Sequence, residues 1–153
     1  MTIPEKLSEL GYSLPQIPKP VGAYLPAVLT GNLLFISGQL PTLAGKLLAE
    51  GKVPSQVPLE TAQKAAAQCV INALAIVASE INNDWSRLVR AVRIGVFVQS
   101  DPTFTDQAKV ANGASELLQK ILGDPGRHAR AAVSAPALPL NAPVEIEFLF
   151  EIK

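Results

Sequence analysis

Two runs in the last quarter of the chain decide its fold: GRHARAAV at residues 126–133 and VEIEF at residues 144–148. From the second run to residue 152 every second residue is apolar, and three of the four residues between them are acidic, which is typical of a strand with one buried face. The apolar face holds Val144, Ile146, Phe148, Phe150 and Ile152, and the other face holds Glu145, Glu147 and Glu151. The first run predicts a strand of small residues beside it, interrupted by Arg130. A proline-rich connector, residues 136–143, joins the two.

Arg130 beside a strand of carboxylates suggests a site for a small anion. A guanidinium can bind a carboxylate through two parallel hydrogen bonds, and a nearby glutamate can transfer protons. The alternative is that Arg130 and a glutamate form only a cross-strand ion pair, which is common and weak at exposed positions. The two runs alone leave both interpretations open.

The rest of the chain predicts alternating strands and helices. Periodicity and turn residues place strands at 23–29, 33–37 and 88–99 and helices at 59–82 and 105–122, with a loop at 41–58. Residues 1–20 form a leader with a short helix at 5–10, followed by an extended path at Pro15, Pro18 and Pro20. The order β-β-α-β-α-β-β over a single domain, residues 1–153, predicts an α+β fold with two helices on one sheet face.

Local features refine this arrangement. Gly31-Asn32 predicts a two-residue hairpin turn, and Pro26 predicts that the first strand lies at an edge or contains a bulge. Strand 88–99 is apolar on both faces and is therefore expected inside the sheet. Gly113 disfavours its helix and predicts a close approach. The sheet face opposite the helices would carry acids beside Val96 and Val98, so we expect another copy of the chain to cover it.

Composition excludes several classes of function. The 153 residues are 48% hydrophobic with zero formal charge, which argues against a nucleic-acid partner despite Arg87, Arg90 and Arg93. The single cysteine and the lack of a signal sequence or long apolar run predict a cytoplasmic protein without membrane contact. One histidine and one cysteine give no metal-ligand spacing, and no phosphate-binding motif occurs, so we expect no metal or cofactor.

An ordered set of short motifs resembles the Rid family, the YjgF-type proteins also labelled L-PSP endoribonucleases. The motifs are GAY at 22–24, LFISGQLP at 34–41, VFV at 96–98, VAN at 110–112, RAAV at 130–133, LP at 138–139 and VEIE at 144–147. The resemblance implies a chorismate-mutase-like fold, a homotrimer and ligand clefts between subunits. It also implies deamination of reactive 2-imino or enamine acids to 2-keto acids and ammonia.

The resemblance assigns roles to matching residues. Arg130 would bind the substrate carboxylate and Glu145 would handle water, as the two catalytic residues. The substrate-binding positions would be Tyr24, Ser37, Gly38, Asn112 and Ala132, the last often a cysteine in the family. Ser115, where many members have an aromatic residue, and the longer loop 41–58 depart from the family pattern and put the substrate range in question.

Three further residues have competing interpretations. His128 could be a general base, but a hydrogen-bonded residue in a turn or at the start of a strand is favoured. Glu147 is expected to pair with an arginine, and Cys69 to be a small core residue. Two alternative functions stay open, namely a non-catalytic module that binds small carboxylates and a ribonuclease or translation inhibitor. Neutral charge and few aromatic residues disfavour the latter.

Overall fold

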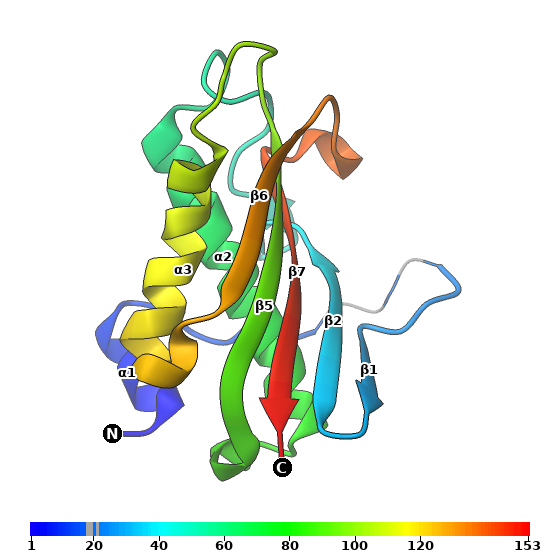
Figure 1. Cartoon of the computed structure of the whole chain (residues 1–153), viewed down its shortest axis with the longest axis vertical. Helices are drawn as coiled ribbons and strands as arrows, with labels where there is room; N and C mark the ends of the chain where they lie inside the picture. The colour runs from blue at the N-terminus through cyan, green and yellow to red at the C-terminus, as the bar shows by residue number, and fades with distance from the viewer. Residues whose placement is uncertain (18–19, 21) are drawn as a thin grey trace.

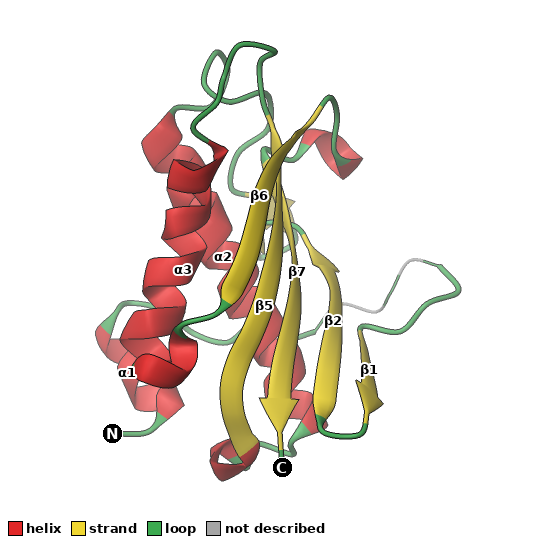
Figure 2. Ribbon diagram, viewed as in Figure 1, coloured by secondary structure: helices red, strands yellow, loops and turns green. Residues whose placement is uncertain are grey.

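A five-stranded mixed sheet carries its two long helices on one face, as the computed structural model shows (Figures 1 and 2). The structure describes residues 1–17, 20 and 22–153. The sheet order is β1-β2-β7-β5-β6, with strands β1 (Ala27–Thr30), β2 (Leu33–Gln39), β5 (Leu88–Gln99), β6 (Ala129–Ala135) and β7 (Val144–Ile152). The helices are α1 (Ile3–Glu9), α2 (Leu59–Glu80) and α3 (Gln107–Leu122). The predicted α+β architecture is confirmed.

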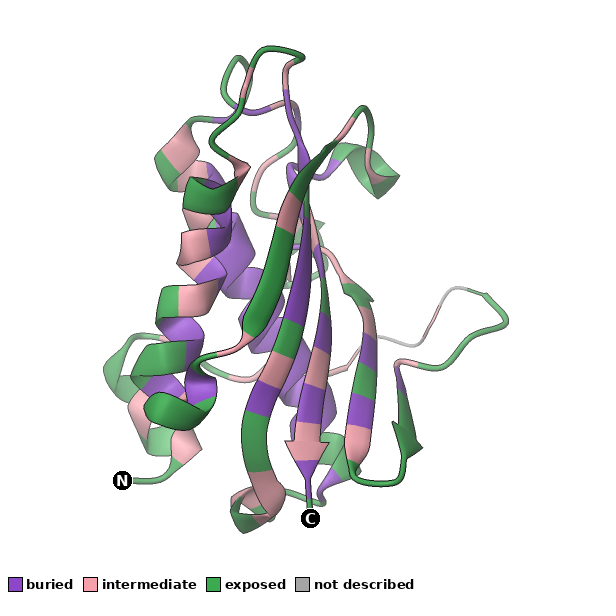
Figure 3. Ribbon diagram, in the orientation of Figure 1, coloured by how far each residue is buried: buried purple, intermediate pink, exposed green. Residues whose placement is uncertain are grey.

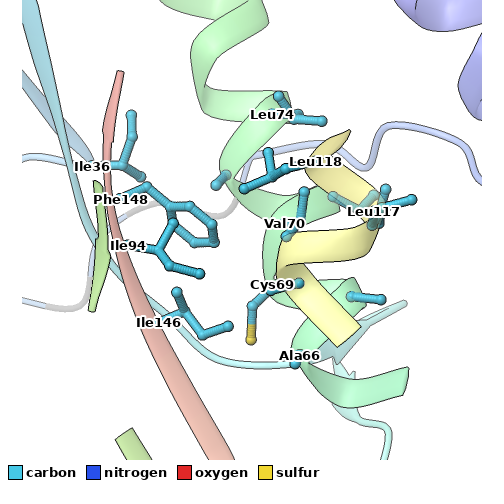
Figure 4. Packing of buried hydrophobic residues seen from close by; sticks show 14 of the residues in the cluster. Ile36, Ala66, Cys69, Val70, Leu74, Ile94, Leu117, Leu118, Ile146 and Phe148 are labelled. Atoms are coloured by element: carbon cyan, nitrogen blue, oxygen red, sulfur yellow. The ribbon is translucent and has the colours of Figure 1, made fainter. Parts of the chain in front are cut away.

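The alternation in β7 has the predicted consequence. Its apolar residues are buried beneath the helices, and the register places Ile94, Val96 and Val98 of β5 on the same face. Side chains from this face point at α2 and α3 (Figure 4). Strand β5 lies between β7 and β6, so its predicted interior position is also confirmed.

Helix α2 forms the centre of the core. Residues 65–78 of this helix are all buried (Figure 3), because alanines on most of its faces let the sheet and α3 approach closely. A Cβ atom at Gly113 of α3 would overlap the Gln63 carbonyl oxygen of α2 and lie 2.8 Å from its Cα. The predicted close approach at Gly113 is therefore confirmed.

Strand β6 does not lie beside β7, contrary to the prediction. It runs parallel to β5 at the sheet edge, and β5 separates it from the carboxylates of β7. The connector crosses the end of β5, where Gln99 makes three hydrogen bonds to it. The backbone N–H of Gln99 donates to Pro143 O, and its side-chain Nε2 donates to Asn141 Oδ1. Its Oε1 accepts from the backbone N–H of Leu138. The apolar strand β5 thereby gains a neighbour on both sides.

Several predicted boundaries change. Strand β1 begins at Ala27 rather than Ala23, although it is an edge strand joined to β2 by the predicted Gly31-Asn32 turn. The predicted loop 41–58 contains a small hairpin, β3 (Thr42–Leu43) and β4 (Lys46–Leu47). Short 3₁₀ helices occupy residues 85–87, 124–126 and 139–141. The predicted extended path at Pro18 lies outside the described residues.

The second face of the sheet is uncovered by any described element and is partly apolar. Val28, Phe35, Phe97 and Val133 share this face and are between 36% and 51% exposed. Glu145, Glu147 and Arg93 lie among them. The expectation that Val96 and Val98 would line this face was wrong, since both side chains point at the helices. We call this surface the open face.

Helix α1 packs at the lower end of α3 (Figure 1). A capping box between Thr2 and Glu5 starts the helix, Leu7 is buried, and Lys6 Nζ donates to Ile121 O at 2.8 Å. Among the described residues, no helix combines the length and apolar character needed to cross a membrane.

Candidate functional site

Arg130 lies on the helix-facing side of β6, opposite Ile94 in the register. Its guanidinium is held by α3: Nη1 donates to Asn112 Oδ1 at 2.8 Å and to Ser115 Oγ at 3.0 Å, and Nη2 donates to Ala108 O at 3.2 Å. These acceptors lie at helical spacing, so one face of α3 orients the fork. An arginine has five N–H donors, and three bonds leave donors for a ligand. The structure thus joins the predicted residues Arg130 and Asn112.

A cavity of about 360 Å³ adjoins this arginine, and Asn112, Ser115, Glu116 and His128 contribute to its wall. His128 directly precedes β6, with Nδ1 2.8 Å from Gly126 O and Nε2 3.0 Å from Ser115 Oγ. Burial, and to a lesser degree the charge of Arg130, lowers the pKa of His128. The favoured interpretation of His128 as a hydrogen-bonded residue at a strand start is confirmed.

A second cavity, of about 240 Å³, lies at the end of β2, toward the opposite edge of the sheet from β6. The predicted residues Tyr24, Ser37 and Gly38 line it, and the leader contributes Ile17 and Pro20. Ser37 Oγ donates to Leu25 O at 2.6 Å, which ties the end of β2 to the segment that carries Tyr24. Three of the residues predicted to bind substrate therefore share one cavity.

Glu145 packs against the wall of this second cavity. A Cβ atom at Gly38 would lie 3.1 Å from the Glu145 Cδ and would overlap Oε1, so only glycine leaves the carboxylate its place. Burial, and secondarily the charge of Glu147, raises the pKa of Glu145 above its ordinary value. A half-buried carboxylate with this property can accept and return a proton.

The two cavities are far apart within one chain. Arg130 is on β6 and Gly38 on β2, with β5 and β7 between them, which corresponds to about 14 Å at the usual strand spacing. Arg130 and Glu145 also face opposite sides of the sheet. The predicted Ala132 is half-buried against the core and lines neither cavity.

The alternative of a cross-strand pair between Arg130 and a glutamate does not occur in the described part of the chain. The glutamate that pairs is Glu147, whose Oε1 lies 3.2 Å from Arg93 Nη1 on the open face. The expectation that Glu147 partners an arginine is confirmed. Cys69 is buried in the core as expected, and burial followed by the charge of Glu145 raises the pKa of its thiol.

Comparison with known proteins agrees with this architecture. Residues 5–152 match the family described as "YjgF/chorismate mutase-like, putative endoribonuclease". The chain belongs to this family.

Relatives within the YjgF/chorismate mutase-like family extend over nearly the whole chain. Protein TCP17 of Trypanosoma cruzi is 37% identical over 147 residues, which cover 95% of this chain and 91% of that protein. A Dermatophagoides farinae protein named 2-iminobutanoate/2-iminopropanoate deaminase is 27% identical, over 92% of this chain and 94% of its own. The crystal structure of an Agrobacterium tumefaciens protein of unknown function is 45% identical, with a TM-score of 0.92, and covers 99% of this chain and 92% of that one.

Two features of the site were not predicted from the sequence. Ser115, noted only as a departure from the YjgF-type pattern, contacts both Arg130 and His128. Asn72, buried in α2, donates to Leu40 O and Thr42 O at 3.0 Å and thereby holds the wall of the second cavity. A polar residue in an otherwise apolar helix was the available signal. Across residues 1–17, 20 and 22–153, no cluster of three or more His, Cys, Asp or Glu suits a metal ion.

Proposed function

We propose that this protein is a deaminase that hydrolyses reactive 2-imino acids, and their enamine tautomers, to 2-keto acids and ammonia. The observation that carries the proposal is the position of the Arg130 guanidinium, which α3 orients beside a cavity. Its contacts to α3 use only part of its five N–H donors, so others can bind a ligand. Such a fork recognises a planar carboxylate bidentately, which a lysine cannot do. The Dermatophagoides farinae relative named as an imine deaminase adds support.

The chemistry needs one carboxylate clamp and one proton-transfer group. Arg130 would bind the substrate carboxylate, and Glu145 would take a proton from water as its oxygen attacks the carbon of the protonated imine. The resulting carbinolamine receives that proton on nitrogen, the C–N bond breaks, and ammonia leaves as the carbonyl forms and the hydroxyl proton is released. The raised pKa of Glu145 suits a group that both accepts and returns a proton.

One chain cannot place both groups on a small substrate, because the two residues face opposite sides of the sheet. We infer that a second copy completes the site, with the β6 edge of one chain meeting the β2 side of another. The partly apolar open face supplies a surface for that association. The resemblance to the Rid family indicates a homotrimer, with 2-imino or 2-keto acids bound between subunits.

The association has a direct test in solution. Phe35 on the open face and Leu29 on the helix-facing side of β1 are 47% and 49% exposed, so they form a matched pair. Light scattering should give a trimer mass for the wild type and for Leu29→Glu, and a smaller mass for Phe35→Glu. A monomeric wild type at micromolar concentration would contradict the shared site.

The deaminase activity is tested by generating 2-aminoacrylate enzymatically and measuring whether the protein accelerates 2-keto acid release. Arg130→Ala should lose both turnover and binding of 2-oxobutanoate. Glu145→Gln should keep binding but lose about 10²–10⁴-fold in rate, whereas Glu147→Gln on the same strand serves as the control. Binding of 2-oxobutanoate without any turnover would instead identify a non-catalytic carboxylate-binding module.

A further inference from the structure

His128, Ser115 and Arg130 form a continuous hydrogen-bond chain, and while the imidazole is neutral only one arrangement of protons satisfies all of it. Arg130 Nη1 must donate to Ser115 Oγ, since a guanidinium has no acceptor. The Ser115 hydroxyl can then donate to His128 Nε2 at 3.0 Å, which requires the neutral imidazole to carry its proton on Nδ1. Nδ1 in turn donates to Gly126 O at 2.8 Å. The neutral tautomer of His128 thus gives the Ser115 hydroxyl an acceptor.

We propose that His128 and Ser115 are positioning residues for Arg130, and that through them the binding of a carboxylate is coupled to uptake of a proton. This inference rests on the proposed function in one respect, namely that Arg130 binds the carboxylate. Neither residue needs to touch the reacting atoms. Ser115 stands where the resemblance gave no role, and His128 is the chain's single histidine.

Protonation changes both the charge and the hydrogen bonds around the arginine. A protonated Nε2 must donate to Ser115 Oγ, which then accepts from His128 and Arg130 together through its two lone pairs. The Ser115 hydroxyl hydrogen is released toward the cavity, where a bound carboxylate could accept it. Imidazolium and guanidinium also repel each other, and a carboxylate between them offsets that repulsion. Both effects strengthen carboxylate binding when His128 is protonated.

The charges around His128 leave Arg130 as its principal neighbour. Glu116 of α3 and Arg127 line the same cavity, and Arg127 Nε lies 4.0 Å from Asp124 Oδ1. Arg90 of β5 donates to the Arg127 carbonyl at 3.0 Å. Arg130 is the charged residue that lowers the pKa of His128, in addition to burial. Because a bound carboxylate raises that pKa, ligand affinity must rise as pH falls, by linkage.

A proton NMR titration tests the network, since one histidine needs no assignment in tag-free protein. Without ligand, Arg130→Gln should raise the pKa of His128, and an unchanged value would overturn the network. In the wild type, saturating 2-oxobutanoate should raise the same pKa. Affinity measured by calorimetry should increase roughly threefold to tenfold from about pH 8 to about pH 5. A ligand that binds without moving the histidine signal would overturn the coupling.

Two variants separate this linkage from other titrating groups. His128→Gln, which stays neutral, should make the affinity for 2-oxobutanoate flat over this pH range, while Ser115→Ala should weaken binding at pH 8. If the pH dependence persists in His128→Gln and disappears in Glu145→Gln, the linkage belongs to the carboxyl group and the inference is wrong. Absence of 2-oxobutanoate binding at every pH overturns the coupling and the carboxylate clamp together. Absence of turnover with intact binding would contradict only the deaminase function.

Discussion

Replacing Gly38 with alanine should displace the Glu145 carboxylate and stop it from transferring protons, although no titratable residue is replaced. The added Cβ would overlap the Glu145 Oε1 and lie 3.1 Å from Cδ and 3.3 Å from Cγ. The carboxylate is the far end of a flexible side chain, so it can rotate away from the methyl group. The variant therefore moves the proposed proton-transfer group while its chemistry is kept.

The size of the effect differs between stability and rate. Gly38 has no left-handed backbone conformation, so alanine is tolerated there, and the restriction of the unfolded chain offsets part of the crowding. We expect the free energy of unfolding to change by no more than about 1 kcal/mol. Loss of general acid–base assistance should lower kcat by about 10²-fold or more. The affinity for 2-oxobutanoate should stay within roughly threefold, since Arg130 is on another strand.

Gly95→Ala is a matched control on the neighbouring glutamate. A Cβ at Gly95 would lie 2.7 Å from Oε1 and 2.9 Å from Cγ of Glu147, so it perturbs the Arg93–Glu147 pair in the same way. Turnover of enzymatically generated 2-aminoacrylate, calorimetric affinity and urea unfolding should be measured for both variants, and their masses compared. Gly95→Ala should also change the free energy of unfolding by no more than about 1 kcal/mol, since the Arg93–Glu147 pair is half-exposed, and it should keep its rate per site.

Full activity in a well-folded Gly38→Ala variant would refute the role given to Glu145. A loss of rate in Gly95→Ala, with an unchanged mass and an active Gly38→Ala, would indicate that Glu147 is the catalytic carboxylate. Equal losses in both variants, accompanied by a lower mass, would assign the effect to assembly instead.

Three further changes test other parts of the argument. Arg130→Lys should weaken 2-oxobutanoate binding by at least about tenfold, since an ammonium group cannot keep the planar contacts to α3 and still bind a carboxylate bidentately; near-native calorimetric affinity would contradict this. Gly113→Ala should lower the urea midpoint, because overlap with the Gln63 backbone, at about 1–3 kcal/mol, exceeds the helix preference of about 1 kcal/mol. Folding raises the pKa of Glu145 above 4.5. The protonated carboxyl group therefore stabilises the folded state below pH 4.5, and this contribution is lost as the pH rises through the raised pKa. Glu145→Gln should thus gain stability relative to the wild type from about pH 4 to about pH 7, and urea unfolding should reveal a constant difference if this is wrong.

Periodicity predicted the elements whose two faces differ. The apolar residues at every second position of β7 identified its buried face, and the start and end of β5 are those expected. The Ala-rich strand β6 offers no such contrast, so its pattern could not show that Arg130 faces α3. The prediction that β6 pairs with β7 was also wrong. Strand pairing is non-local, and a connector of eight residues, 136–143, can cross another strand. The small β3–β4 hairpin was missed since its turn contains Ala44 at a φ of 51°, a conformation rare for alanine.

Motif resemblance identified residues of both cavities but not their separation. Tyr24, Ser37 and Gly38 line the second cavity together. Asn112 and Arg130 line the first cavity and are joined by a hydrogen bond. The contact between Ser115 and His128 spans the turn after α3, and neither side chain has a pattern that predicts it. Ala132 shows the opposite case, because a motif position can be kept while its side chain only packs against the core.

The residues that fit their helix worst explain why the site lies on α3. Asn112-Gly113 disfavours a helix locally, yet each residue has a tertiary contact that offsets the cost. Gly113 brings α3 against the Gln63 backbone, and the adjacent Asn112 accepts from Arg130 at the sheet edge. Close packing of α2 and α3 therefore sets the position of the helix whose other face orients the guanidinium. Residues that disfavour their own helix are expected where one segment serves both function and stability. Here the close packing at Gly113 holds α3 in place directly beside Asn112, which orients the proposed carboxylate clamp.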